Sequence, residues 1–184
     1  MTKITIIAAT DAEITPIMSY FGDKLTYLVS GIGPVASAIA VGRAMKDFAP
    51  NLVLGVGIAG AIDHSLAIGQ AVIVARDYVA DLGAFRGDKF EKFDSPVVEY
   101  PYIVDGFQSV TARTVSSACA PFIDDQSQIE TMEGAALMLA AKTIGVRFMQ
   151  LRTISNYVDS PRSAWQIERA IELLPPAIAQ LLKI

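Results

Sequence analysis

The sequence predicts an α/β protein, in which strands of one sheet alternate with helices along the chain. Lys3–Ala9 is rich in β-branched residues, as in a buried strand, and Thr10-Asp-Ala-Glu13 then begins a helix. Near the other end, a helix that starts around Glu130 precedes a strand over Val146–Ile154. That strand ends in the polar pair Ser155-Asn156. Open α/β sheets form their ligand crevices at such strand ends.

Length and composition suit a single domain over residues 1–184. The chain is 52% hydrophobic and 18% charged, so it can bury a sizeable core. A net charge of −4 without a Lys/Arg cluster argues against a nucleic-acid partner. The lone Cys119 and the lone His64 exclude an internal disulfide and a zinc cluster, and we expect no metal. No apolar run is long enough for a membrane, and Met1 leads directly into a strand, so we expect a cytoplasmic protein.

Glu13 has two interpretations. Thr10 and Glu13 form a capping box, which by itself explains a carboxylate in the first turn of a helix. Alternatively, Glu13 lies beside the carboxyl end of the first strand, where ligands bind. The next expected elements are a strand over Leu25–Val29, a turn over Ser30–Gly33 and an Ala-rich helix over Val35–Phe48 that Pro34 opens.

Leu52–Gly60 is a predicted buried strand that contains a literal Gly-x-Gly-x-x-Gly at Gly55, Gly57 and Gly60. A dinucleotide fingerprint needs a helix immediately afterwards. Only the eight residues Ala61–Ile68 are available for such a helix before Gly69 leads into the next strand, so we expect no cofactor. The glycines instead favour a close approach of the backbone to a flat ligand.

The remaining segments are less regular. We expect strands over Ala71–Ala75 and Ser109–Ser116, with a surface excursion over Phe85–Val110 that suits a subunit contact. Arg162–Ile184 predicts a final helix that its two prolines, Pro175-Pro176, should kink or split. Trp165 on that helix belongs either to the core or to the wall of a ligand pocket.

Two stretches carry the strongest functional signal: Glu130-Thr-Met-Glu-Gly-Ala-Ala136 and Leu151-Arg-Thr-Ile-Ser-Asn-Tyr157. They resemble the nucleoside phosphorylase and nucleosidase superfamily, and within it the futalosine hydrolases of menaquinone biosynthesis. The resemblance covers most of the chain and is weak from about Phe85 to Phe107. It implies one domain with a mixed, twisted β-sheet flanked by helices, as in purine nucleoside phosphorylases, and it implies a homo-oligomer, a dimer or larger.

The resemblance also implies site residues. Glu13 would activate the attacking water, Met132 and Glu133 would hold the ribose, and Ser155 and Asn156 would hold the purine, Asn156 with a catalytic role. Further implied substrate contacts are Ile58, Ala59, Gly60, Arg152 and Trp165. Arg152 orients Glu133, or it forms an ordinary structural ion pair.

The nucleophile can be argued from two positions. Phosphorylases of the superfamily place an Arg and a Ser where this chain has Gly55 and Ile58. Neither residue supplies a charge or a hydroxyl, and an unpaired phosphate dianion is costly to desolvate. Water is therefore the expected nucleophile.

Asn156 is the basis for predicting the substrate. Its NH2 group has two donors that suit N7 and O6 of a 6-oxopurine, but it cannot protonate a leaving adenine. This points to an inosine-like nucleoside such as futalosine, whose benzoate would need a cation, Arg113 or Arg162. Asn can also pair with adenine, so hydrolysis of methylthioadenosine, adenosylhomocysteine or aminofutalosine is the alternative. A phosphorylase and a nucleoside-binding protein without catalysis are more distant alternatives.

Overall fold

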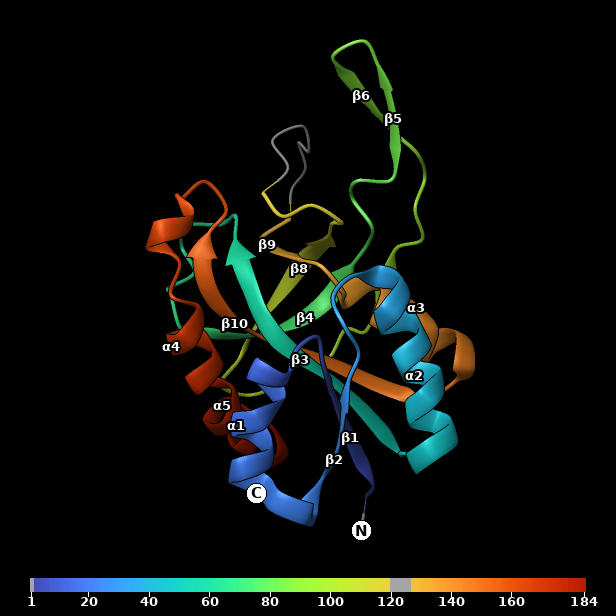
Figure 1. Cartoon of the computed structure of the whole chain (residues 1–184), viewed down its shortest axis with the longest axis vertical. Helices are drawn as coiled ribbons and strands as arrows, with labels where there is room; N and C mark the ends of the chain where they lie inside the picture. Colours follow the sequence, from blue (N-terminus) through green and yellow to red (C-terminus); the bar gives the residue numbers. More distant parts are fainter. Residues whose placement is uncertain (1, 120–126) are drawn as a thin grey trace.

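The computed structural model describes residues 2–119 and 127–184, which form one mixed β-sheet flanked by helices on both faces (Figure 1). The main sheet has eight strands in the described part of the chain. They are β1 (Ile4–Ala8), β2 (Thr26–Val29), β3 (Leu52–Ala61), β4 (Ala71–Asp77), β7 (Val98–Glu99), β8 (Gln108–Thr114), β9 (Ile129–Thr131) and β10 (Arg147–Tyr157).

The long central strand β3 organises this sheet. One edge of β3 pairs in parallel with β10 along its whole length. The other edge pairs first with β1 and then, near its carboxyl end, with β9. From β9 the sheet continues through β8 and β4 back to β10, so these strands close into a ring, while β1 and β2 extend from the other end of β3. The predicted mixed sheet is therefore confirmed, and its curvature brings β9 and β10 to the two sides of the end of β3.

Helices cover the two faces in separate groups. On one face lie α1 (Asp11–Phe21), α4 (Ile167–Glu172) and α5 (Leu174–Leu182), and on the other lie α2 (Pro34–Phe48) and α3 (Gly134–Ile144) (Figure 1). Successive strand residues point to opposite faces. Accordingly, Val53 packs in the core beneath α2 and α3, and Leu54 packs in the core beneath α1 and α5.

Several predicted elements are confirmed. Helix α1 begins with the expected capping box, and α2 begins at Pro34. No helix follows β3 before β4, as the short interval required. The excursion after β4 contains a two-stranded hairpin, β5 (Gly83–Arg86) with β6 (Lys89–Lys92), which projects from the body of the protein (Figure 1).

Two helix predictions need correction. The helix expected from Glu130 begins only at Gly134, because Ile129–Thr131 pairs with both β3 and β8 and is held extended as β9. The final helix is not continuous from Arg162: the short helix η2 (Arg162–Ala164) is followed by extended Trp165, and then by α4 and α5. The break between α4 and α5 falls just before the two prolines, as expected.

Among residues 2–119 and 127–184, none of the helices combines the length and the apolar character that crossing a membrane requires.

Candidate active site

A pocket of about 380 Å³ lies where the carboxyl ends of the parallel strands β1, β3 and β10 meet. This is the edge at which open α/β sheets bind ligands. The pocket is lined by all the predicted site residues except Arg152: Glu13, Ile58, Ala59, Gly60, Met132, Glu133, Ser155, Asn156 and Trp165. These nine are among the twenty residues that line the pocket, and the fold brings their distant segments together.

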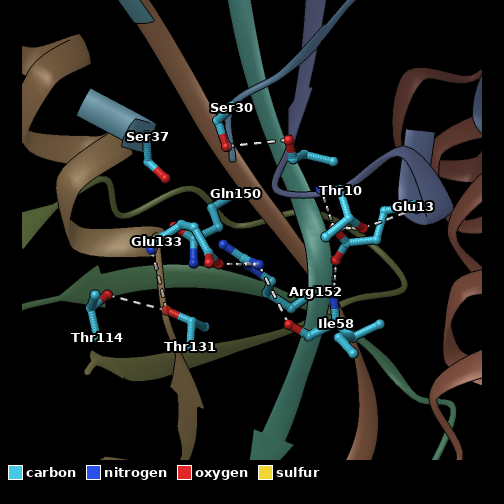
Figure 2. Close-up of polar contacts among 12 residues, drawn as sticks. Thr10, Glu13, Ser30, Ser37, Ile58, Thr114, Thr131, Glu133, Gln150 and Arg152 are labelled. Atoms are coloured by element: carbon cyan, nitrogen blue, oxygen red, sulfur yellow. Dashed lines mark hydrogen bonds and ion pairs between the residues drawn. The ribbon is translucent and has the colours of Figure 1, made fainter. Parts of the chain in front are cut away.

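Glu13 is a helix cap and a pocket carboxylate at the same time. Its Oε2 accepts hydrogen bonds from the backbone N–H of Thr10 (3.1 Å) and from the Thr10 hydroxyl (2.9 Å). Its Oε1 accepts the backbone N–H of Ile58 on β3 (3.2 Å), and the residue is only 5% exposed (Figure 2). These contacts fix the carboxylate against β3, so the two interpretations of Glu13 are compatible.

Glu133 is held from two directions. The backbone N–H of Gly33 donates to its Oε1 (3.2 Å), and Arg152 Nη1 lies 3.7 Å from its Oε2. Arg152 is 2% exposed and lies behind the pocket wall, where Nη1 also donates to the Ile58 carbonyl (3.4 Å) (Figure 2). Arg152 does not line this pocket, and its distance to Glu133 supports the other predicted role, orienting that carboxylate.

The start of α3 aims Glu133 at the pocket. Glu133 is the residue before the first helical turn, whereas the helix predicted to start around Glu130 would have placed it within that turn. The first helical N–H groups are capped from neighbouring strands instead: Gly134 donates to the Thr131 hydroxyl (3.3 Å) and Ala135 donates to the Thr114 hydroxyl (2.8 Å). Such side-chain acceptors satisfy the unpaired donors of a helix terminus and stabilise it.

The three glycines of β3 have different neighbours. A side-chain carbon at Gly55 would lie 2.9 Å from Phe148, away from the pocket. At Gly57 it would lie 2.6 Å from Arg152 Nη1 and 2.7 Å from Glu13 Oε1. Only Gly60 lines the pocket, so the expected backbone approach to a flat ligand applies to Gly60 alone.

Ser155 and Asn156 form a hydrogen-bonded pair at the end of β10. The Ser155 hydroxyl donates to Asn156 Oδ1 (2.7 Å), and Asn156 Nδ2 donates to the Tyr157 carbonyl (3.0 Å). The Asn156 amide therefore has a defined orientation, with one N–H of Nδ2 left for a ligand.

Arg113 and Arg162 occupy different environments. Arg113 is buried and donates through Nε (3.0 Å) and Nη2 (2.8 Å) to Glu130 Oε2. Arg162 lines the pocket and lies 4.9 Å from the centre of the Trp165 ring. Trp165 lies in the wall of the pocket, not in the core, because the chain is extended there instead of helical.

A buried carboxyl group that the sequence did not reveal, that of Asp77, lies behind the site. Asp77 is fully buried and accepts hydrogen bonds from Thr114 (3.0 Å), the backbone N–H of Tyr78 (2.8 Å) and Gln150 (3.5 Å). Burial raises its pKa to about 7, although these hydrogen bonds and nearby Arg152 act in the opposite direction. The only sequence signal was a charge at the end of an apolar strand.

Comparison with known proteins identifies the family of the chain. A family model described as the phosphorylase superfamily matches residues 9–120, and the chain belongs to this superfamily. Within it, the chain is an enzyme of the nucleosidase type, related to futalosine hydrolases and to methylthioadenosine/adenosylhomocysteine nucleosidases.

The relatives are moderately similar. The chain is 32% identical over 180 residues to a futalosine hydrolase of Acidothermus cellulolyticus, covering 84% of this chain and 73% of the relative. It is 29% identical over 168 residues to a 5′-methylthioadenosine/S-adenosylhomocysteine nucleosidase of Pseudoalteromonas translucida, covering 77% and 72%. The futalosine hydrolase structure of Helicobacter pylori has a TM-score of 0.84 at 18% identity, covering 99% of this chain and 97% of that one, which confirms the predicted fold.

Proposed function

We propose that this protein hydrolyses the N-glycosidic bond of futalosine and releases hypoxanthine. The observation that carries the proposal is that Glu13, Glu133 and Asn156, from three distant parts of the chain, line one pocket. In the reaction, the oxygen of a water molecule bonds to C1′ as the bond from C1′ to N9 breaks. The base leaves with the electron pair, and Glu13 accepts the proton of the water.

The pocket favours water over phosphate as the nucleophile. Among the described residues that line it, Arg162 is the only cation, and Arg152 lies behind the wall with its Nη1 directed to Glu133 and the Ile58 carbonyl. Ile58 lines the pocket as expected, whereas Gly55 packs against Phe148, so only Ile58 supports the sequence argument at the site. A phosphate dianion would have a single charged partner there, Arg162, to offset its desolvation.

Glu133 and Met132 suit a ribose. The Glu133 carboxylate can accept hydrogen bonds from the 2′- and 3′-hydroxyls, and Met132 offers an adaptable apolar contact. Glycosidic cleavage passes through an oxocarbenium-like transition state, which nearby carboxylates stabilise. Gly33 and Arg152 hold Glu133 in place for this purpose.

Asn156 and Arg162 support futalosine among the candidate nucleosides. Hypoxanthine leaves more readily as an anion than adenine does, so an amide that donates hydrogen bonds without protonating the base is sufficient. Arg162 beside Trp165 provides a cation and an aromatic face for the 5′ benzoate of futalosine. In this role the enzyme would serve menaquinone biosynthesis as a cytoplasmic homo-oligomer.

The second candidate is cleavage of methylthioadenosine or adenosylhomocysteine, which the name of the Pseudoalteromonas relative suggests. Base release from futalosine, inosine and methylthioadenosine, each with and without phosphate, tests both. Phosphate-independent release of hypoxanthine from futalosine is expected. Preferred cleavage of methylthioadenosine would establish the second candidate, and phosphate-dependent turnover would contradict hydrolysis.

A further inference from the structure

Gly60 lies between two polar side chains that come from different strands. In the sheet register, Gly60 pairs with Asn156 of β10 on one side and with Glu130 of β9 on the other. All three residues line the same pocket. Neighbouring strands are about 4.8 Å apart, so the Cα atoms of Asn156 and Glu130 are separated by about 10 Å across a residue without a side chain. A flat base can lie between them.

The Asn156 amide presents a donor toward this gap. The Ser155 hydroxyl engages Oδ1, which leaves Nδ2 on the side of Gly60, where a side-chain carbon would lie 3.1 Å from it. One hydrogen of Nδ2 is bonded to the Tyr157 carbonyl, and the second remains for a ligand.

Glu130 presents an acceptor at the other side. Glu130 is 5% exposed. Arg113 donates through Nε and Nη2 to Glu130 Oε2, and the positive charge of Arg113 compensates the negative charge of this carboxylate. Its Oε1 accepts the backbone N–H of Cys119 (2.6 Å). A carboxylate oxygen can accept two hydrogen bonds, so Oε1 retains capacity for a second donor, and Glu130 lines the pocket.

We infer that Glu130 is a specificity residue that accepts the N1–H of a 6-oxopurine while Asn156 donates to the neighbouring O6. The inference rests on the proposed purine site and decides between its two substrate classes. Across Gly60 the protein offers a donor, Asn156 Nδ2, and then an acceptor, Glu130 Oε1. A 6-oxopurine offers the complementary groups in the same order, the acceptor O6 and then the donor N1–H. Adenine presents an amino group to Nδ2 and the lone pair of N1 to the carboxylate, so both contacts are unfavourable.

A structural role is the competing explanation, because Glu130 joins β9 to β8 through Arg113 and holds Cys119. The two roles differ in their dependence on the base. A carboxylate that accepts a hydrogen bond from N1–H changes the relative affinity for different bases. A carboxylate that only supports the pocket wall changes the affinity for every purine equally.

Equilibrium binding of free bases by calorimetry tests the inference without requiring turnover. The unaltered protein should bind hypoxanthine about 10- to 100-fold more tightly than 1-methylhypoxanthine or adenine, the range for a hydrogen bond to a charged group. In Glu130→Gln, whose amide can donate to adenine N1, the preference for hypoxanthine over adenine should fall at least about 10-fold. Glu99→Gln is the matched control: it removes a surface carboxylate that pairs with Arg76, and its base preference should not change.

Equal binding of hypoxanthine and 1-methylhypoxanthine by the unaltered protein would overturn the inference, as would no measurable hypoxanthine binding. Equal weakening of both bases in Glu130→Gln would assign Glu130 to structure alone. The proposed hydrolysis is contradicted by a different result. If the protein discriminates between the bases but cleaves no nucleoside, the role of Glu130 is supported and the proposed hydrolysis is contradicted.

Discussion

Glu13 and Arg152 both approach the point on β3 where Gly57 has no side chain. A Cβ atom there would lie 2.7 Å from Glu13 Oε1 and 2.6 Å from Arg152 Nη1. The glycine thus allows the proposed base, and the arginine that holds Glu133, to lie against the same strand (Figure 2). Packing at this residue is therefore tied to the positions of two proposed site residues.

Gly57→Ala should lower both stability and activity. The added methyl group overpacks a buried position, which typically costs about 1–3 kcal/mol in the free energy of unfolding. Displacement of Glu13 or Arg152 should reduce base release beyond what the loss of folded protein explains. Urea unfolding and turnover at a temperature where the variant is folded measure the two effects. Gly42→Ala is the control: on α2 it meets nothing within 4 Å and should stabilise by about 0.5–1 kcal/mol. Full activity in Gly57→Ala would show that the site tolerates the shift.

Glu13→Gln should abolish hydrolysis. It should also lower stability by about 1–3 kcal/mol, because both carboxylate oxygens accept a backbone N–H, from Thr10 and from Ile58, and the single amide oxygen leaves one of these donors unpaired. Gln also completes a capping box, so the helix start survives, but the amide cannot accept a proton. Loss of a general base typically costs about 10²- to 10⁴-fold in kcat. Base release from futalosine, together with thermal unfolding, separates the two roles. Turnover at the original rate would remove Glu13 from the mechanism.

Asn156→Asp should shift preference toward adenine nucleosides. A carboxyl group at this position can protonate N7 of a departing adenine, which the amide cannot do. The ratio of kcat/KM for futalosine to that for aminofutalosine isolates the base, because the two substrates share the 5′ group. A ratio equal to that of the original enzyme would contradict the proposed role of Asn156.

Arg162→Gln should weaken the binding of futalosine without affecting the binding of inosine. Arg162 supplies the single cationic side chain among the described residues that line the pocket, and inosine carries no carboxylate for it to bind. Because the arginine is exposed, we expect an increase of about 3- to 10-fold in KM for futalosine. An equal change for inosine would mean that Arg162 supports the pocket generally, through its contact with Trp165.

Asp77 should make the protein less stable as the pH rises from about 4 to 7. Its folded-state pKa is raised from 3.8 to about 7, so over this range the folded state binds the proton more strongly than the unfolded state does. The unfolding free energy then falls with pH, by an amount on the order of a few kcal/mol at most, and levels off above the folded-state pKa.

Asp77→Asn should remove that part of the pH dependence. The Asn amide stays neutral, and its NH2 group can donate to Gln150 Oε1, a buried atom without a hydrogen-bond partner in the described structure. Urea unfolding at pH 5 and pH 8 for both proteins measures the change. Identical pH dependence in the two proteins would show that Asp77 does not titrate in this range.

By itself, the sequence determined the features that depend on neighbours along the chain. The capping box of Thr10 and Glu13, the start of α2 at Pro34 and the presence of a strand before Ser155 all follow from local propensity and spacing, although β10 continues through Ser155-Asn156 to Tyr157. The stretches around Met132 and Asn156 also carried the resemblance to the superfamily, because a short string of residue types can be read without knowing the fold.

Tertiary structure decided the features that depend on distant partners. Residues Ile129–Thr131 became a strand because β3 and β8 satisfy their backbone groups, which outweighs the helix propensity of the sequence that follows. Trp165 and Arg162 reach the pocket because the chain breaks before α4. Glu130 faces Asn156 across Gly60 only when the sheet curls, since register between strands 70 or more residues apart leaves no periodic trace in a single sequence.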